Sequence, residues 1–294
     1  HLRYGTSGAF GTSGCHPYVR RTNYPTKSMM VLGNFNMTNA RDLNHHLIDR
    51  GQHPVFDTDT QTVLEEIGYH LDEAHDAIYR RERDKANPTP GREIPGIISE
   101  EIDISRILQK CGEIWDGGYS IAGVVGNGDA FVLRDPNGIR PCFFYEDEEV
   151  IAFASERVPL MTVFTAELKE LAPGHVGVMD HKGGFEIKPF ATPAATPTPC
   201  SFERIYFSRG NDPSIYRERM KLGENLVPRV IERIDDDLDK TIFSFIPNTA
   251  EIAYYGLMHG LRKLRRDEVK ASILKAAAEG ELDEEAIDKL ILKS

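Results

Sequence analysis

The sequence has 294 residues, of which 40% are hydrophobic and 28% are charged. This balance is typical of a globular protein, and the length fits one large domain or two ordinary ones. The net charge of −11 argues against a nucleic-acid partner, because affinity for a phosphate backbone comes from clustered lysines and arginines. No apolar run approaches the roughly 20 residues of a membrane-spanning helix, and we expect no secretory signal. We therefore expect no membrane partner.

The four cysteines lie far apart in the sequence, at Cys15, Cys111, Cys142 and Cys200. A secreted scaffold held by disulfides would be shorter and richer in cysteine, and no CxxC pair indicates a zinc site. We therefore expect reduced thiols and a cytoplasmic location.

The first part of the chain predicts a loop, one strand and several helices. Four glycines between Gly5 and Gly14 indicate a loop, which we expect to act as a lid over the site. Residues 29–36 (MMVLGNFN) predict a buried strand that ends in a turn. Hydrophobic spacing and capping residues predict helices from Thr38 or Asn39 to Ile48, from Thr60 to about Arg83, and over 102–115, with a loop over 87–96.

From Tyr119 onward the hydrophobic pattern changes from the period of helices to that of strands. Short apolar runs separated by Gly, Asn, Asp or Glu predict antiparallel strands. These runs are YSIAGVVG, AFVLRD, PCFFYE, EVIAFAS and HVGVMD. Helices followed by a block of strands, without regular βαβ alternation, indicate a layered α+β domain.

A Pro- and Thr-rich segment, Ala191 to Pro199 (ATPAATPTP), has the composition of a linker. It places a domain boundary at about residue 198, between a first domain (1–198) and a second (199–294). The second domain predicts a helix near 214–235, a buried strand over 241–247 (TIFSFIP), a helix over 249–264 and a charged helical pair after it. One strand cannot bury a sheet face with helices alone, so we expect this domain to be incomplete.

Three short segments carry candidate chemistry: Arg3-Tyr4-Gly5-Thr6, the stretch from Gly33 to Asn39 (GNFNMTN), and Asp59-Thr60-Gln61. Each alone has an ordinary explanation, since Asn often forms turns and Asp often caps helices. In this order and spacing they resemble the glutamine-binding site of class II glutamine amidotransferases. That pattern runs Gly-His-x-Arg-Tyr-x-Thr, His-Asn-Gly-Asn-x-Thr-Asn and Ser-Asp-Thr-Glu. The resemblance implies the four-layered αββα sandwich of the N-terminal-nucleophile hydrolases.

Later segments narrow the resemblance to the amidophosphoribosyltransferase family. They are RDPNGIRP (134–141), ASE (154–156), PGH (173–175), PCSFERIYF (199–207) and SIYR (214–217). The resemblance implies a glycosyltransferase with glutamine amidotransferase activity, which makes phosphoribosylamine from glutamine and phosphoribosyl pyrophosphate in the first step of purine synthesis. It also implies Mg²⁺ that arrives with phosphoribosyl pyrophosphate, a homo-oligomer, and a second domain that is the start of a phosphoribosyltransferase domain.

The resemblance assigns roles that suit the chemistry of glutamine. Arg3 would bind the α-carboxylate, Asp59 the α-ammonium, and Thr6 would add a hydrogen bond. The side-chain amide of Asn34 and the backbone N–H of Phe35 would form the oxyanion hole, at a spot about 3 Å from each. We expect both donors to face the same cavity as Arg3 and Asp59.

The sequence also departs from the family pattern. The family's nucleophile is an N-terminal Cys whose own amino group acts as base, and this residue is absent, since Cys15 lies downstream of the Arg-Tyr motif. We therefore expect an inert fragment that starts after the nucleophile. Gly33 replaces a His and Phe35 replaces a Gly, which raises the question of a strained turn. The phosphoribosyl pyrophosphate loop is missing too. Cys200 stands where some members bind an iron–sulfur cluster, but no partner cysteines follow, so a plain thiol is expected.

Two alternatives stay open. The chain could come from another class II amidotransferase, of the glucosamine-6-phosphate or asparagine synthetase type, although RDPNGIRP and CSFERIYF count against this. It could also be a non-catalytic paralogue that binds glutamine or a nucleotide as a regulator, which the replacements at Gly33 and Phe35 would favour.

Overall fold

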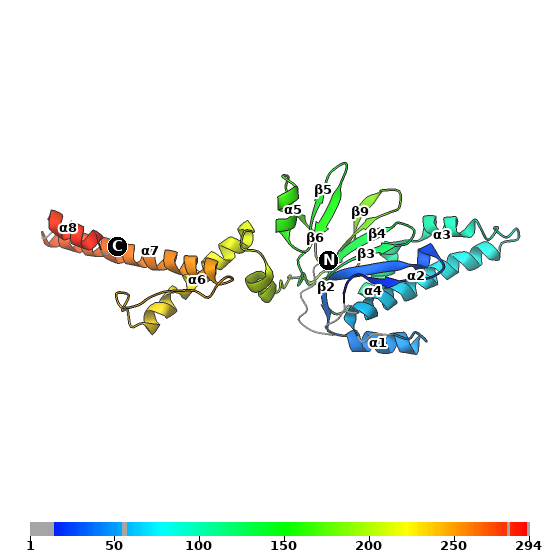
Figure 1. The fold of residues 1–294 in the computed structure, drawn as a ribbon, viewed down its shortest axis with the longest axis horizontal. Helices are drawn as coiled ribbons and strands as arrows, with labels where there is room; N and C mark the ends of the chain where they lie inside the picture. The colour runs from blue at the N-terminus through cyan, green and yellow to red at the C-terminus, as the bar shows by residue number, and fades with distance from the viewer. Residues whose placement is uncertain (1–14, 55–57, 281–282, 293–294) are drawn as a thin grey trace. The chain divides into compact units, whose positions relative to one another are not determined.

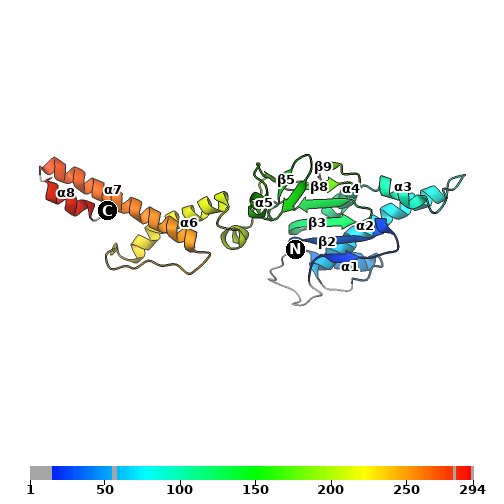
Figure 2. The same cartoon turned by 45° about the horizontal axis from the view of Figure 1, so that its top comes forward.

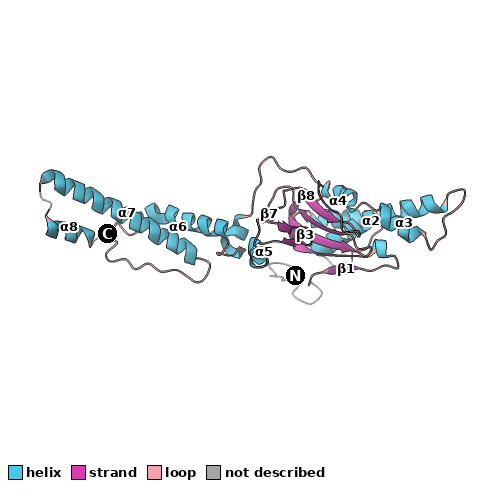
Figure 3. Ribbon diagram, turned by 90° about the horizontal axis from the view of Figure 1, so that it is seen from above, coloured by secondary structure: helices cyan, strands magenta, loops and turns pink. Residues whose placement is uncertain are grey.

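The computed structural model describes residues 15–54, 58–280 and 283–292. The chain divides into two compact units, with the division between Cys200 and Ser201, two residues from the predicted boundary at 198. Strands of the described residues occur only in the first unit (Figure 3). No helix among the described residues has the length and apolar character to span a bilayer.

The first unit contains two antiparallel sheets. A six-stranded sheet has the order β1-β2-β3-β4-β8-β9, and a three-stranded sheet has the order β6-β5-β7. The strands of the larger sheet are β1 (Tyr18–Arg20), β2 (Met29–Met37), β3 (Gly117–Val125), β4 (Ala130–Arg134), β8 (His175–Met179) and β9 (Phe185–Pro189). Those of the smaller sheet are β5 (Phe143–Glu146), β6 (Ile151–Ala154) and β7 (Lys169–Glu170).

Helices cover one face of the larger sheet, with α2 and α4 packed against it (Figures 1 and 2). The helices of this layer are α1 (Ala40–Asp49), α2 (Asp59–Arg83), α3 (Ile94–Glu101) and α4 (Ile104–Gly112). On β2 the buried side chains Met29, Val31 and Met37 alternate along the strand and join the core with Ile67 and Leu71 of α2. Because strand side chains alternate, this set defines which face of β2 looks toward the helices.

The smaller sheet packs on the other face of the larger one. Phe144 of β5 stacks on Phe153 of β6 with ring centroids 5.3 Å apart, and Phe153 contacts Phe185 of β9. On the outer face of β5, Tyr145 stacks on Phe164 at the end of α5 (Arg157–Val163), with centroids 4.0 Å apart. The layers therefore run helix, sheet, sheet, helix, which confirms the predicted αββα class.

Several predicted boundaries in this unit differ from the structure. The segment 87–96 was predicted as a loop, but α3 already begins at Ile94, since Pro95 lies in its first turn, where a missing N–H costs nothing. The predicted helix over 102–115 begins only at Ile104, because the side chain of Asp103 caps it by accepting the N–H of Arg106. Strands β1, β7 and β9 and helix α5 were not predicted.

In the described residues of the second unit, only helices and loops occur: a π-helical turn (Glu203–Phe207), α6 (Pro213–Arg233), α7 (Glu251–Glu279) and α8 (Glu284–Ile291). The predicted strand over 241–247 is wrong, since Ile242 and Ile246 are 95% and 84% exposed. An apolar run needs a neighbouring strand before it can enter a sheet, and the described part of this unit offers none. The predicted helix over 249–264 continues instead to Glu279 as α7.

Candidate functional site

Asn34 and Phe35 lie within strand β2 and not in the predicted turn. Asn34 is in register with Ser120 of β3, and Phe35 with Tyr119. Phe35 faces the helix layer and packs against the core, so Asn34 faces the opposite side. Among described residues other than glycine, a positive φ occurs only at Asp235 and Asp236. Phe35 therefore causes no backbone strain of the kind that its replacement of Gly suggested.

The N–H of Phe35 points away from β3. The N–H of Gly33 donates to Nδ1 of His16 at 3.1 Å, on the edge opposite β3, whereas the N–H of Thr38 donates toward β3, to the carbonyl of Asp116 at 2.9 Å. Since N–H directions alternate along an antiparallel strand, Phe35 shares the orientation of Gly33. Its N–H lies outside the β2–β3 ladder, as an oxyanion donor requires.

One imidazole joins this strand to the start of α2. Nε2 of His16 lies 3.1 Å from Oγ1 of Thr60, while Nδ1 accepts the N–H of Gly33. Thr60 directly follows Asp59, and Gly33 directly precedes Asn34. The structure therefore brings together the segments that carry Asn34, Phe35 and Asp59. Sequence reasoning missed His16, because a histidine next to a glycine-rich loop matches no motif.

Asp59 is the first residue of α2, and it follows the N-cap. The side chain of Thr58 caps the helix by accepting the N–H of Gln61 at 3.2 Å. A carboxylate in the first turn is also favourable for the helix dipole, so Asp59 has a structural reason to be there as well. Arg3, Thr6 and the loop from Gly5 to Gly14 lie outside the described residues. Their parts in the site, and the common cavity, stay predictions.

The two departures from the family pattern in the Asn-rich motif, Gly33 and Phe35, depend on each other. A Cβ on Gly33 would lie 2.8 Å from Cδ1 of Phe35 and 2.4 Å from the carbonyl oxygen of Ser120. Phe35 stands two residues along the same strand face, so its ring lies against the space above Gly33. A histidine at position 33 would not fit beside this ring.

Other residues of the same motif fasten the end of β2. Thr38 donates its hydroxyl to the carboxylate of Asp116 at 2.6 Å. The amide of Asn39 donates to the carbonyl of Ile114 at 2.8 Å and accepts the N–H of Asp116 at 3.2 Å. Asn39 occupies the predicted N-cap position of α1, but its side chain makes no capping bond. These bonds fix the strand that carries Asn34.

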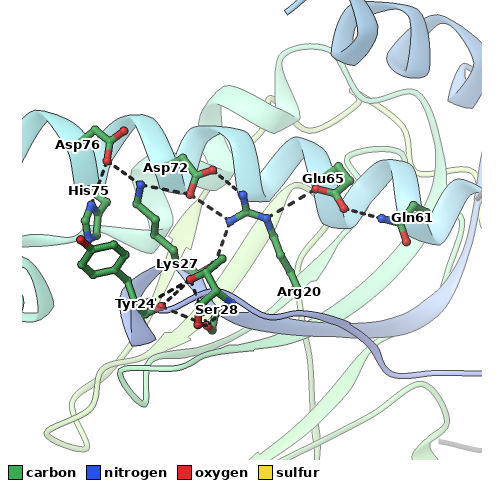
Figure 4. Close-up of polar contacts among 10 residues, drawn as sticks. Arg20, Tyr24, Lys27, Ser28, Gln61, Glu65, Asp72, His75 and Asp76 are labelled. Atoms are coloured by element: carbon green, nitrogen blue, oxygen red, sulfur yellow. Dashed lines mark hydrogen bonds and ion pairs between the residues drawn. The ribbon is translucent and has the colours of Figure 1, made fainter. Parts of the chain in front are cut away.

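Ion pairs fasten β1 and the turn after it to α2 (Figure 4). Arg20 donates to both carboxylate oxygens of Asp72 and lies 3.6 Å from Glu65, and Lys27 donates to Asp76 at 2.6 Å. Burial raises the pKa of Glu65 against the opposing effect of Arg20. Burial alone would raise the pKa of Asp76 as well, but its hydrogen bonds, chiefly from Lys27, lower it overall. These ion pairs of Arg20 and Lys27 hold β1, the strand next to His16, against α2.

The RDPNGIRP segment is a structural scaffold. The fully buried Asp135 accepts the N–H of Ile139 and of Arg140, each at 2.9 Å. The carbonyls of this loop accept N–H groups from the predicted linker and the residue after it: Pro136 from Ala194 at 2.9 Å, Asn137 from Thr198 at 2.8 Å and Ile139 from Cys200 at 3.1 Å. The segment predicted as a linker is therefore bound to the first unit along its length.

The cysteines of the described region differ in exposure. Burial raises the pKa of Cys142 to about 11 and that of Cys111 well above its usual range, so both are unreactive thiols. Cys15 is exposed and Cys200 is partly buried. Among the described residues, no group of three or more His, Cys, Asp or Glu side chains could hold a metal ion.

Comparison with known proteins gives a consistent set of relatives. No family model matches the sequence. A curated protein of Pseudomonas aeruginosa is 27% identical over 271 residues, covering 89% of this chain and 49% of that protein. One of Escherichia coli is 27% identical over 260 residues, covering 85% and 46%, and one of Saccharomyces cerevisiae is 26% identical over 264 residues, covering 85% and 47%. All three are named amidophosphoribosyltransferase.

Solved structures agree with this resemblance. Glutamine phosphoribosylpyrophosphate amidotransferase from B. subtilis, complexed with ADP and GMP, aligns with a TM-score of 0.61 at 19% identity, covering 89% of this chain and 49% of that one. A structure described as the allosteric regulatory enzyme of purine biosynthesis aligns with a TM-score of 0.62 at 20% identity, covering 88% and 48%. These alignments show the fold. The chain spans about half the length of the curated relatives it matches.

Proposed function

We propose that this chain is part of an amidophosphoribosyltransferase. In the intact protein, glutamine would be hydrolysed to glutamate and ammonia, and the ammonia would replace pyrophosphate at C1 of phosphoribosyl pyrophosphate. The observation that carries the proposal is the similarity to amidophosphoribosyltransferases over 85 to 89% of the chain.

The described residues would supply part of the chemistry that a glutamine site needs. The carboxylate of Asp59 at the start of α2 would bind the α-ammonium of glutamine. The Phe35 N–H, directed out of the β2–β3 ladder, and the Asn34 amide would bind the oxyanion that forms on the side-chain carbonyl. Arg3 would hold the α-carboxylate, Thr6 would add a hydrogen bond, and the nucleophile would be a cysteine that this sequence does not contain.

The two units would then divide the reaction between them. The first unit would be the glutaminase domain of an N-terminal-nucleophile hydrolase, and the second would be the beginning of the phosphoribosyltransferase domain. Mg²⁺ would enter bound to phosphoribosyl pyrophosphate as part of that substrate. The intact protein would be a cytoplasmic homo-oligomer.

Pyrophosphate release from phosphoribosyl pyrophosphate tests this function, measured on the intact protein with glutamine and then with ammonium as nitrogen donor. We expect activity with both donors. Asp59→Ala should raise the KM for glutamine and leave the ammonium reaction unchanged, because only glutamine carries the α-ammonium. Asp147→Ala, in an exposed turn, serves as control. No pyrophosphate release with either donor would contradict the proposal, and glutamine binding without turnover would favour the regulatory alternative.

A further inference from the structure

We propose that His16 is a positioning residue of the glutamine site, and that it sets the separation between the oxyanion strand β2 and the start of α2. This inference rests on the proposed function for the identity of the ligand. The bridge consists of His16, Gly33 and Thr60, all of which lie in the described part of the chain.

The hydrogen bonds fix which nitrogen of His16 carries the proton. The backbone N–H of Gly33 can only donate, so Nδ1 of His16 must accept and is unprotonated. The neutral ring therefore has its proton on Nε2, which donates to the hydroxyl of Thr60 at 3.1 Å. The two ring nitrogens of His16 thus connect β2 to α2. The residues that they contact, Gly33 and Thr60, are 27 positions apart in the sequence.

Packing holds the ring in this orientation. The ring of His16 lies 5.7 Å from that of Tyr18 in an edge-on arrangement and 5.8 Å from that of Phe35. At its other end the bridge meets a rigid partner, because Thr60 is 4% exposed and lies in the first turn of α2. The ring has little freedom to move without breaking a hydrogen bond.

The bridge acts on the residues next to it. Gly33 is bonded to Asn34 along β2, and Thr60 to Asp59 along α2. In the proposed site, Asn34 and Phe35 bind the reacting amide of glutamine, while Asp59 binds the α-ammonium at the other end of the molecule. Glutamine can span the two groups only within the reach of its side chain, so an error in their separation weakens binding and misplaces the amide. The hydrogen bonds of His16 go to Gly33 and Thr60, the neighbours of the residues proposed to bind glutamine, so we assign it an effect on position.

Three substitutions of His16 separate its polar contacts from its volume. His16→Gln can accept the Gly33 N–H with its amide oxygen and donate to Thr60 with its amide nitrogen. His16→Phe keeps an aromatic ring and loses both hydrogen bonds, and His16→Ala loses both the hydrogen bonds and the ring. Thr60→Val removes the same bridge from the other end while keeping the shape of the side chain.

Steady-state glutaminase kinetics of the intact protein provide the main measurement. In His16→Ala and His16→Phe, kcat/KM for glutamine should fall about 10- to 100-fold, as expected for a misplaced substrate, with most of the change in KM. His16→Gln should retain most of the activity, and ammonium-dependent synthesis should not change. Thr60→Val should act like His16→Phe, and the two changes together should cost little more than either one.

Other results overturn the inference. Wild-type kinetics in His16→Ala would do so, as would full activity in His16→Phe, which would leave the ring volume as the sole requirement. An equal loss of glutamine- and ammonium-dependent activity would mean a general structural role. Amide hydrogen exchange of peptides covering 29–37 gives an independent readout, with faster exchange expected in His16→Ala but not in His16→Gln. If the wild type lacks glutaminase activity and the exchange difference is still found, the bridge stands and the proposed function fails.

Discussion

The carboxylate of Asp135 accepts the backbone N–H of Tyr119 at 3.3 Å, and Tyr119 is the residue that pairs with Phe35 across β2 and β3. The same carboxylate accepts two N–H groups of the loop that follows β4, from Ile139 and Arg140. One buried side chain therefore connects the strands of the candidate site to the loop that holds the segment 191–200.

The first prediction concerns this carboxylate. Asp135→Ala would leave three N–H groups without their acceptor in a buried place, so we expect a loss of at least about 3 kcal/mol in the free energy of unfolding. Urea denaturation measures it. Asp147→Ala is the matched control, because Asp147 also accepts two backbone N–H groups, but in an exposed turn where water can replace it. Equal losses in both variants would contradict the structural role of Asp135.

The second prediction concerns Gly33. A methyl group there would lie 2.4 Å from the carbonyl oxygen of Ser120, a backbone atom that cannot move without disturbing the sheet. Gly33→Ala should therefore lower the free energy of unfolding by about 1 to 3 kcal/mol. Gly96→Ala in α3 is the control, because its Cβ would meet nothing within 4 Å and alanine favours helices. A Gly33→Ala protein as stable as the wild type would mean that the strand has room at this position.

Hydrophobic patterning was sufficient to predict most strands and helices of the first unit and its layered class, because local periodicity reports which face is buried. It failed where tertiary contacts determine whether a segment forms a strand. The run over 241–247 has strand character but no sheet to join, and Ile242 stays exposed. In the motif GNFN, polar residues suggested a turn, yet the ladder with β3 continues to Met37.

In the candidate site, too, some features could be predicted from the linear sequence and others depend on tertiary contacts. Asn34, Phe35 and Asp59 could be named from spacing, because they belong to a pattern in the linear sequence. The bridge through His16 could not, because its geometry depends on the pairing of β1 with β2 and on where α2 begins. The coupling of Gly33 to Phe35 was equally hidden, since it arises only when both lie on one face of a strand.

The third prediction concerns pH. Burial lowers the pKa of His75 below its ordinary value of 6.5, in spite of the opposing hydrogen bond to the carboxylate of Asp76. The ring is also faced by Lys27 and Asp72, and it packs between Tyr24 and Tyr79. Near pH 6 the unfolded chain therefore binds more protons at this residue than the folded chain does, so stability rises with pH through this range and falls as the pH drops below 6.5.

Urea denaturation at about pH 7.5 and about pH 5.5, on either side of the ordinary pKa of histidine, measures this effect. His75→Phe removes the titrating group and keeps an aromatic ring, so the loss of stability on acidification should be smaller than in the wild type. His181→Phe provides a control of opposite sign, since hydrogen bonds to Asp129 and Glu100 raise the pKa of His181. An unchanged pH dependence in His75→Phe would show that His75 does not titrate differently on folding.

The fourth prediction concerns the contact between α6 and α7, where two glycines let the backbones approach each other. A Cβ on Gly223 would lie 1.8 Å from the carbonyl oxygen of Ala253, and one on Gly256 would lie 2.0 Å from that of Met220. A third glycine, Gly260, differs because its Cβ would first meet Cγ2 of Val227 at 2.6 Å, the end of a side chain.

Alanine at these three positions should therefore give graded effects. Each Gly→Ala change in a helix gains up to about 1 kcal/mol of intrinsic helix propensity. At Gly223 and Gly256 the helices must separate to admit the methyl group, and we expect overpacking of about 1 to 3 kcal/mol or more to outweigh that gain. At Gly260 the side chain of Val227 can rotate, so the net change should be near zero or stabilising. Thermal unfolding followed by circular dichroism at 222 nm, where helix dominates the signal, ranks the three variants. Equal destabilisation by Gly260→Ala, Gly223→Ala and Gly256→Ala would contradict this prediction. It would mean that α6 and α7 also pack too tightly at Gly260 for a methyl group.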